Sequence, residues 1–257
     1  LSFDAPYTYT LNNNTITFDA GSVPGFTGIA ATQTRGSAPH TINSNLALAN
    51  DITIRNNSAG TLSLNGNTST AGNDIAFDGS GTTAVSGVIS GGGAISKSES
   101  GTVQLNATNT YTGGTTLTAG TIGVGNNTAL GTGSLTMSDA TTLKSLSGVA
   151  LANLVTLNGA STFDTNGQSL GMTGVISGVG SLTKTGLGSL SLNAANTYTG
   201  NTLIQSGAII LNGSITSNTT EMITAVRFRD GQRVSRGQVL VELKAGEEDA
   251  GLIEARA

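Results

Sequence analysis

Short runs in which apolar and polar residues alternate fill the chain up to about residue 220. Examples are residues 102–106, 133–137 and 189–193. An alternation with a period of two predicts β-strands that bury one face. The runs end at Gly, Asn or Asp, residues that accept the backbone conformations of sharp corners. Since the sequence before residue 220 has no helical apolar stripe, the pattern predicts an all-β region of many short strands.

An internal repeat lies within this region. Residues 87–126 align without a gap with residues 174–213, at an offset of 87 positions, and about half of the aligned residues are identical. Self-similarity at a fixed spacing is typical of solenoids, in which one structural unit stacks on the next. A coil of about 20 residues would place about four turns in each 87-residue unit.

Many short strands could also form a sandwich or a flat barrel. The ungapped repeat favours a solenoid, and so does the aromatic content of only 4%, because a β-helix has a thin interior of stacked aliphatic side chains. Asn and Thr are abundant at the expected turns, where stacked side chains can form hydrogen bonds along the axis. The sequence therefore predicts a parallel β-helix for residues 1–218.

The composition excludes several classes of function. Charged residues make up 10% of the chain, against about 25% in an average protein, and the net charge is −4. Without a basic patch, a nucleic-acid partner is not expected. The chain has no Cys, and no apolar run approaches the roughly 18 residues of a membrane span. The first residues lack the features of a signal peptide, so a mature segment or a fragment is expected.

The composition changes near residue 220. Six of the 11 Lys and Arg residues and seven of the 15 Asp and Glu residues lie in residues 221–257, which contain no Asn. We therefore expect a second unit at residues 219–257.

The candidate catalytic residues are few. His40 is the only histidine, and beside Pro39 it is expected to be a solvated loop residue. Asp74 and Asp78 form the closest pair of carboxylates before residue 220, and glycoside hydrolysis requires two. Because they flank a short apolar run, we expect them to bracket a strand and to cap turns. No catalytic residue, metal ligand or cofactor site is predicted.

The repeats contain two pairs of equivalent residues with polar groups. Lys97 and Lys184 are expected to form a solvated stripe that protects strand edges from aggregation. Tyr111 and Tyr198 are expected to pack at a corner rather than to stack on carbohydrate. The glycines 91–93 resemble part of a calcium-binding repeat but lack its Asp, so no calcium site is expected. Asn13, Asn56 and Asn106 are among the residues that fit the glycosylation sequon, as expected by chance in a chain so rich in Asn and Thr.

Residues 178–192, followed by Asn196, Tyr198, Gly200 and Gly207, closely resemble the autotransporter-associated β-strand repeat. Residues 91–120 resemble a second copy, which departs from the family pattern at Glu99, where the family has Gly. The resemblance implies a right-handed parallel β-helix passenger that is exported across an outer membrane to the cell surface or the medium. Such passengers serve as adhesins, stalks or scaffolds, so glycans or cell surfaces are the expected partners. The translocating β-barrel of the family is expected to be missing from this sequence.

The tail resembles a different family. Residues 223–243 look like the biotinyl/lipoyl-like half motif of periplasmic adaptor (membrane fusion) proteins, and residues 247–257 resemble the start of the helix that follows it. This resemblance implies a short β-hairpin plus a helix start, which would pair with a second lipoyl half. No lysine occupies a lipoylated turn, so neither lipoyl nor biotin is expected. A natural fusion and a joined or truncated reading frame are both open.

Three functions follow from these patterns. The first is a non-catalytic structural or adhesive surface module. The second, which rests on the tail, is a fragment of a periplasmic adaptor of an efflux or secretion pump. The third is a polysaccharide-acting β-helix enzyme, which the scarcity of clustered carboxylates disfavours.

Overall fold

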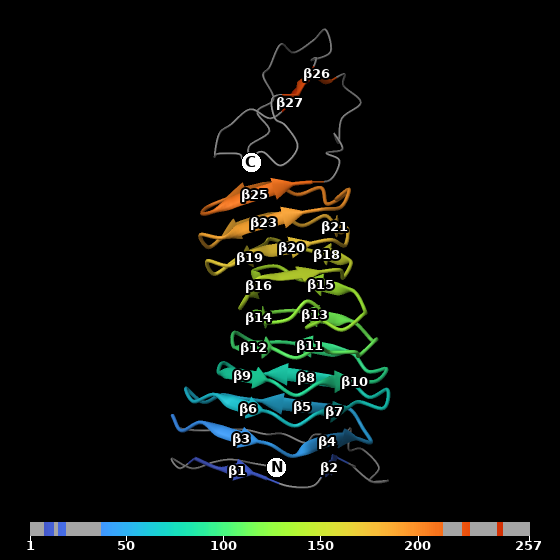
Figure 1. Ribbon diagram of the computed structural model, residues 1–257, viewed down its shortest axis with the longest axis vertical. Helices are drawn as coiled ribbons and strands as arrows, with labels where there is room; N and C mark the ends of the chain where they lie inside the picture. Colours follow the sequence, from blue (N-terminus) through green and yellow to red (C-terminus); the bar gives the residue numbers. More distant parts are fainter. Residues whose placement is uncertain (1–7, 13–14, 19–36, 213–222, 227–240, 244–257) are drawn as a thin grey trace.

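The computed structural model describes residues 8–12, 15–18, 37–212, 223–226 and 241–243. Its main body is a parallel β-solenoid whose coils stack along one axis (Figure 1). All strand pairs from β1 to β25 are parallel, and the described residues contain no helix. The predicted all-β parallel solenoid is therefore confirmed.

Each coil passes through up to three sheets. The longest sheet has ten strands and the second has seven, and two four-stranded sheets complete the third side. The ten-stranded sheet consists of β1 (Thr10–Leu11), β3 (His40–Ile42), β6 (Leu62–Leu64), β9 (Thr82–Val85), β12 (Thr102–Leu105), β14 (Thr121–Val124), β16 (Thr141–Ser145), β19 (Ser161–Asp164), β22 (Leu182–Thr185) and β24 (Thr202–Ile204).

The seven-stranded sheet consists of β5 (Ile52–Arg55), β8 (Ile75–Asp78), β11 (Ile95–Lys97), β13 (Thr115–Leu117), β15 (Leu135–Met137), β18 (Val155–Leu157) and β21 (Ile176–Gly178). The third side consists of β2 (Thr15–Phe18), β4 (Asn45–Leu48), β7 (Thr68–Ser69) and β10 (Ile89–Ser90) in one sheet, and of β17 (Val149–Leu151), β20 (Leu170–Met172), β23 (Ser189–Leu192) and β25 (Ala208–Leu211) in the other. Between these two sheets, residues 106–114 and 125–134 follow the third side without forming a strand.

The strand register gives the length of a coil. Along the seven-stranded sheet, Ile95 pairs with Thr115, Thr115 with Leu135, Leu135 with Val155, and Val155 with Ile176. These coils therefore take 20 or 21 residues each, and the step from Ile52 to Ile75 takes 23, which agrees with the predicted coil of about 20 residues.

The duplicated unit, however, is longer than four coils. Four coils lead from Ile95 only to Ile176, whereas the repeat equivalent of Ile95 is Leu182. Leu182 begins β22 in the ten-stranded sheet, while Ile95 begins β11 in the seven-stranded sheet. The prediction of about four turns per unit is thus corrected to four turns and one further side.

The core consists of columns of inward side chains, one from each coil. The alternation of buried and partly exposed residues along the strands follows the period of two seen in the sequence. One column of the ten-stranded sheet contains Val103, Ile122, Leu143 and Phe163, all buried. Each fully buried aliphatic side chain adds about 1.5 to 3 kcal/mol, so these columns hold the coils together.

The tail contains one pair of strands among its described residues. β26 (Ile223–Val226) and β27 (Val241–Leu243) pair antiparallel, with an irregular register between Ile223 and Ala225. This pairing agrees with the predicted hairpin. The proposed helix start at residues 247–257, the turns of the half motif and the boundary near residue 218 lie outside the described residues, and the likeness to an adaptor protein stays a prediction.

Candidate functional site

The two equivalent lysines of the repeats lie inside the solenoid. Lys97 exposes 1% of its surface and Lys184 none. Lys97 stands in an inward column between Phe77 and Leu117, and Lys184 stands between Phe163 and Ile204. The prediction of a solvated stripe was wrong. Each lysine follows a buried aliphatic residue by two positions in its strand, so its side chain points to the same inward face.

The ammonium group of each lysine reaches the corner that follows its strand. Lys184 Nζ donates hydrogen bonds to Thr165 Oγ1 at 2.9 Å and to the carbonyl oxygens of Thr185 at 2.6 Å, Gly186 at 2.8 Å and Ser206 at 3.0 Å. These four oxygens come from three successive coils. A buried ammonium is costly unless its protons are hydrogen-bonded, and here they are.

Lys97 forms the equivalent corner after the seven-stranded sheet, whereas the Lys184 corner follows the ten-stranded sheet. Its Nζ contacts the carbonyl oxygens of Ser98, of Glu99 at 2.8 Å and of Ala119 at 3.5 Å. Burial lowers the pKa of Lys97 to about 8, against the opposing charges of Asp78 and Glu99, so the side chain is still an ammonium at neutral pH. Burial likewise lowers the pKa of Lys184, and the charge of Asp164 opposes this shift.

A glycine closes each lysine corner. Gly120 and Gly207 both have a φ of 76°, in the region that favours glycine. A Cβ at Gly120 would lie 3.0 Å from Lys97 Nζ, and one at Gly207 would lie 2.8 Å from Lys184 Nζ. The spacing of Lys and closing Gly in the repeat is therefore explained by one corner geometry.

The repeat asparagines join neighbouring coils, whereas the hydroxyl of each repeat tyrosine contacts a threonine of its own coil. The Tyr111 hydroxyl lies 2.6 Å from Thr115 Oγ1, and the Tyr198 hydroxyl lies 2.6 Å from Thr202 Oγ1. Tyr111 is fully buried and Tyr198 packs against the core, which agrees with the predicted packing role. Burial raises the pKa of both tyrosines.

Asn109, two residues before Tyr111, bridges the coils on either side of its own. Its Oδ1 accepts a hydrogen bond from Ile89 N at 2.8 Å, and its Nδ2 donates one to the carbonyl oxygen of Ala129 at 2.7 Å. Its equivalent Asn196 accepts the matching bond from Ile176 N at 2.8 Å. The Asn of the Asn-x-Tyr element is therefore a connection between coils.

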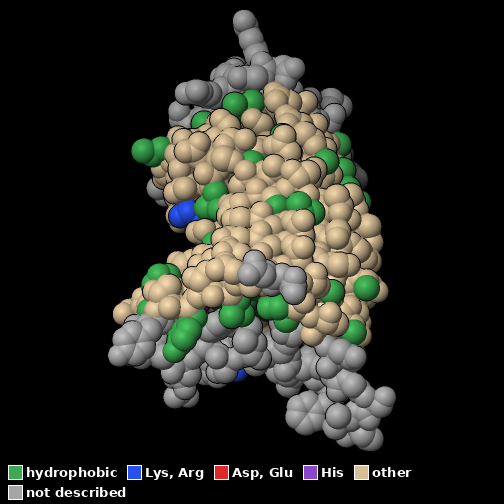
Figure 2. Space-filling view, turned by 60° about the horizontal axis from the view of Figure 1, so that its bottom comes forward, with side chains coloured by type: hydrophobic (Ala, Val, Ile, Leu, Met, Phe, Trp, Pro, Cys, Tyr) green, Lys and Arg blue, Asp and Glu red, His purple; other side chains and the backbone are tan. Residues whose placement is uncertain are grey.

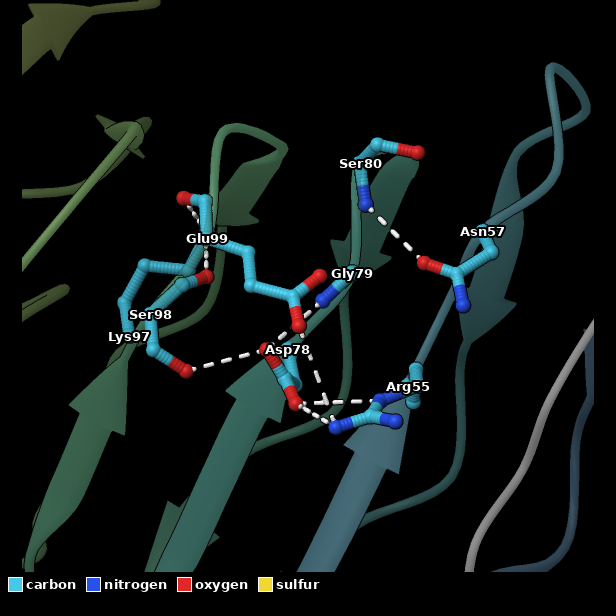
Figure 3. A network of polar contacts seen from close by, with 8 residues as sticks. All are labelled: Arg55, Asn57, Asp78, Gly79, Ser80, Lys97, Ser98 and Glu99. Carbon is cyan, nitrogen blue, oxygen red and sulfur yellow. Dashed lines mark hydrogen bonds and ion pairs between the residues drawn. The ribbon is translucent and has the colours of Figure 1, made fainter.

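One cluster of charged side chains lies at the corner after the seven-stranded sheet (Figure 3). Arg55 pairs with Asp78 of the next coil and lies 3.8 Å from Glu99 of the coil after that. Ser98 Oγ donates to Asp78 Oδ1 at 3.0 Å. Glu99 has a φ of 58°, where the other repeat has Gly186 at 77°. Charges and hydrogen bonds thus connect three coils at the corner that also contains Lys97, as Lys184 does after the ten-stranded sheet.

The surroundings of Asp78 lower its pKa. Burial alone raises the pKa, but hydrogen bonds from Arg55, Gly79 and Ser98, together with the charge of Arg55, outweigh it. A carboxyl whose folded pKa is lowered stabilises the fold fully above its unfolded pKa of about 4. This stability is lost as the pH falls through the folded pKa.

We therefore expect Asp78→Asn to weaken the acid dependence of stability. In urea unfolding followed by circular dichroism, the wild-type chain should lose free energy of unfolding below about pH 4, and the variant should lose less over the same interval. Equal losses in both chains would show that Asp78 does not contribute.

Asp74 serves the turn before β8. Its Oδ1 accepts a hydrogen bond from Ala94 N at 2.7 Å, and its own N donates to Asp51 Oδ1 at 2.8 Å. Asp74 and Asp78 thus bracket β8 and support turns, as predicted. Within the part of the chain that the structure describes, no group of three or more His, Cys, Asp or Glu residues could hold a metal ion.

His40 is buried rather than solvated. It belongs to β3, exposes 1% of its surface and stacks on Tyr9 with ring centroids 5.7 Å apart. The prediction of a loop residue was wrong, because His40 starts an inward column above Leu62. Burial lowers the pKa of His40, which favours the neutral ring.

Two further sequence candidates prove to be structural. Gly93 lies so close to the neighbouring coil that a Cβ would be 1.8 Å from the carbonyl oxygen of Asn73. Asn56, the acceptor of one sequon, is fully buried, and its Nδ2 donates to the carbonyl oxygens of Gly60 and Thr82. Of the other two sequon residues named above, Asn13 lies outside the described residues and Asn106 is exposed.

The outer faces of the two long sheets carry ladders of hydroxyl groups. Adjacent strands bring these groups about 4.8 Å apart, and none of the ten-stranded sheet's six hydroxyls bonds to another described residue. On the ten-stranded sheet the ladder is Thr82, Thr102, Thr121, Thr142, Thr162 and Thr183. On the seven-stranded sheet it is Ser96, Thr116, Thr136, Thr156 and Ser177.

The face seen in Figure 2 is largely polar and uncharged, with only scattered hydrophobic side chains. The strongly exposed aliphatic residues Leu154, Val179 and Leu187 lie in different turns of the chain. Among the described residues, no helix has the length and apolar character that a membrane span requires.

Comparison with known proteins agrees with this architecture. The family model of the passenger-associated transport repeat matches residues 95–124 and 182–211, the two segments that contain the lysine corners. The chain is 39% identical over 131 residues to the adhesin BmaC autotransporter of Brucella suis biovar 1 (strain 1330). This match covers 49% of the chain and 4% of that relative's length. No solved structure matches the chain at a significant level.

The matched segments and the geometry describe the same unit. Each matched segment begins with the strand that contains the buried lysine. Each also includes the bridging Asn, the packed Tyr and the closing Gly. The chain thus carries two passenger-associated transport repeats within a parallel β-helix, and about half of it is similar to a small part of an autotransporter adhesin.

Proposed function

We propose that this chain is part of an autotransporter passenger, exposed at the cell surface or secreted. There it is a non-catalytic adhesive module that presents its sheet faces to glycans or other components of a cell surface. One observation carries the proposal. The Lys and bridging Asn side chains that the repeats share hold coils together, and the shared Tyr side chains pack in the interior, so the outer faces are what is left for a partner.

Two further observations support it. The matched relative bears the name of an adhesin. The hydroxyl ladders offer rows of groups that donate and accept hydrogen bonds on nearly uncharged faces, which suits a neutral, hydroxyl-rich partner such as a glycan. The charged side chains Lys144 and Asp164, which lie beside the ladder of the ten-stranded sheet, neutralise each other at 3.2 Å.

The test is adhesion of beads coated with the full chain to cultured host cells. We expect the wild-type chain to bind and Thr121→Arg/Thr162→Arg to bind at least about tenfold less, because two charges on the ten-stranded face would have to be desolvated against a neutral partner. The matched control is Thr136→Arg/Thr156→Arg on the seven-stranded face, which shows whether one face or both carry the contact.

Two results would contradict the proposal. Wild-type beads that bind no better than uncoated beads would exclude adhesion by this chain, and equal binding by all three chains would exclude the ladders. Incubation with plant and bacterial polysaccharides tests the non-catalytic part, since we expect no release of new reducing ends. Circular dichroism should confirm that each variant keeps its β-structure.

A further inference from the structure

The hydroxyl ladder of the ten-stranded sheet runs parallel to the axis of the solenoid. Its six threonines, from Thr82 to Thr183, come from six successive coils, and each pairs with the next in the strand register. The row ends at Leu203, which pairs with Thr183. Within the described residues, the hydroxyls of these six threonines bond to no other group. They therefore keep their donors and acceptors for a ligand.

The repeated hydroxyls are present along the axis and absent across it. The second row of outer positions on the same strands has no common chemistry, since it consists of Ala84, Gln104, Gly123, Lys144 and Asp164. A polymer that ran along one strand would meet a single threonine and one of these residues before the corner. A polymer that ran along the axis would meet a threonine at every coil, about 4.8 Å after the last.

The row and its neighbouring row carry no net charge. Lys144 and Asp164, the two charged residues of the second row, pair with each other at 3.2 Å. A charged ligand would therefore lose its hydration without gaining an unpaired counter-ion, whereas a neutral chain of hydroxyl groups has no charge to desolvate. The charge pattern favours a neutral ligand.

We propose that the ligand of this face is an extended, neutral polysaccharide that lies parallel to the solenoid axis, with one sugar at each coil. The inference rests on the proposed adhesive function and specifies the ligand of the same face. In a β-1,4-linked chain, which is extended, each sugar advances by nearly the spacing between two coils, about 4.8 Å. Each sugar also carries hydroxyls on both edges, so successive sugars can bond to successive threonines.

The ladder of the seven-stranded sheet suits such a ligand less well. It is shorter, because the residue that pairs with Ser96 on the preceding coil is Ala76. At its other end, Ser177 Oγ already donates a hydrogen bond to the carbonyl oxygen of Val155 at 3.2 Å. The ten-stranded sheet therefore offers the longer row of hydroxyls that are available to a ligand.

Isothermal titration calorimetry of the full chain with oligosaccharides of two to six units tests the proposal. The probes are β-1,4-linked oligosaccharides of glucose and of N-acetylglucosamine. We expect the affinity for at least one series to rise at least about tenfold from two units to six, because each added sugar contributes hydrogen bonds of modest net strength. Oligosaccharides of α-1,4-linked glucose are the matched control. Their chains curve away from a straight row, so their affinity should not rise with length.

Two substitutions distinguish a ligand along the axis from one that crosses the sheet. Thr142→Arg divides the row into three threonines and two, so six units should bind no more tightly than three. Thr183→Arg removes only the end of the row, so six units should bind like five. Circular dichroism of both variants should match that of the wild type.

Three results would overturn the axial ligand. The first is no binding of either β-1,4-linked series, and the second is an affinity that does not rise with length. The third is an affinity for six units that Thr142→Arg leaves unchanged or lowers no more than Thr183→Arg does. If wild-type beads still adhered to cells in any of these cases, the adhesive function would stand and only the axial ligand would fail. Beads that did not adhere would exclude the adhesive function itself.

Discussion

Replacing Gly93 by Ala should lower the free energy of unfolding of the solenoid by about 3 kcal/mol, the upper range for forcing an extra group into a packed site. A Cβ at this position would lie 1.8 Å from the carbonyl oxygen of Asn73 and 3.0 Å from Thr70 Cβ. Backbone atoms must move to relieve the first contact. That movement would disturb the hydrogen bond from Gly93 N to Thr70 Oγ1, at 3.0 Å, which connects the two coils. Urea unfolding followed by circular dichroism measures the loss.

The neighbouring glycine provides the control. At Gly92 the nearest heavy atom to an added Cβ would be Gly72 Cα at 3.5 Å, an ordinary contact. Gly92→Ala should therefore change the free energy of unfolding by no more than about 0.5 kcal/mol, as surface substitutions usually do. Similar losses at both positions would mean that the close approach of two coils at Gly93 is not the cause.

Truncation of Tyr111 should have an effect of similar size or larger. Tyr111→Ala removes a fully buried aromatic ring, and such changes cost about 3 to 5 kcal/mol. It also removes the hydroxyl partner of Thr115, which is itself buried. Tyr111→Phe keeps the ring and should cost about 1 to 3 kcal/mol, because it leaves the Thr115 hydroxyl without this partner.

The second repeat contains the matched position. Tyr198 makes the same contact to Thr202 but is only partly buried, so Tyr198→Ala should cost clearly less than Tyr111→Ala in the same urea titration. If the two truncations cost the same, the depth of burial would not be the source of the larger effect. If Tyr111→Phe cost as much as Tyr111→Ala, the ring would add nothing beyond its hydroxyl.

Most of the solenoid could be predicted from the sequence because its strands obey a period of two and its unit is duplicated. The alternation places Val103 and Leu105 on one face, and the structure buries both. Coil length was predictable for the same reason, since the spacing of strands along the chain is nearly constant. The exact number of turns in the duplicated unit was not predictable. An error of one residue in the coil length decides whether 87 residues make four whole coils or four coils and a further side.

The buried lysines and His40 were missed for a different physical reason. The alternation contained the signal, since Lys97 follows Ile95 by two positions and Lys184 follows Leu182 by two. A charged residue is nevertheless rarely buried without partners. The partners of the two lysines are carbonyl oxygens of their own corner and of the next coil, an arrangement that becomes visible only when the coils are stacked. Sequence alone cannot show a set of hydrogen-bond acceptors that includes main-chain atoms of residues about 20 positions apart.

The extra third of a turn in the duplicated unit sets the direction in which repeats face. A probe attached to the same residue of two successive units would point to different sides of the rod, because Lys97 precedes the corner after the seven-stranded sheet and Lys184 precedes the corner after the ten-stranded sheet. Further units at the same spacing would place equivalent residues on a slow spiral that returns to its starting side at the fourth copy. An array of this kind would offer equivalent surfaces in three directions, whichever side of the rod met a neighbouring cell.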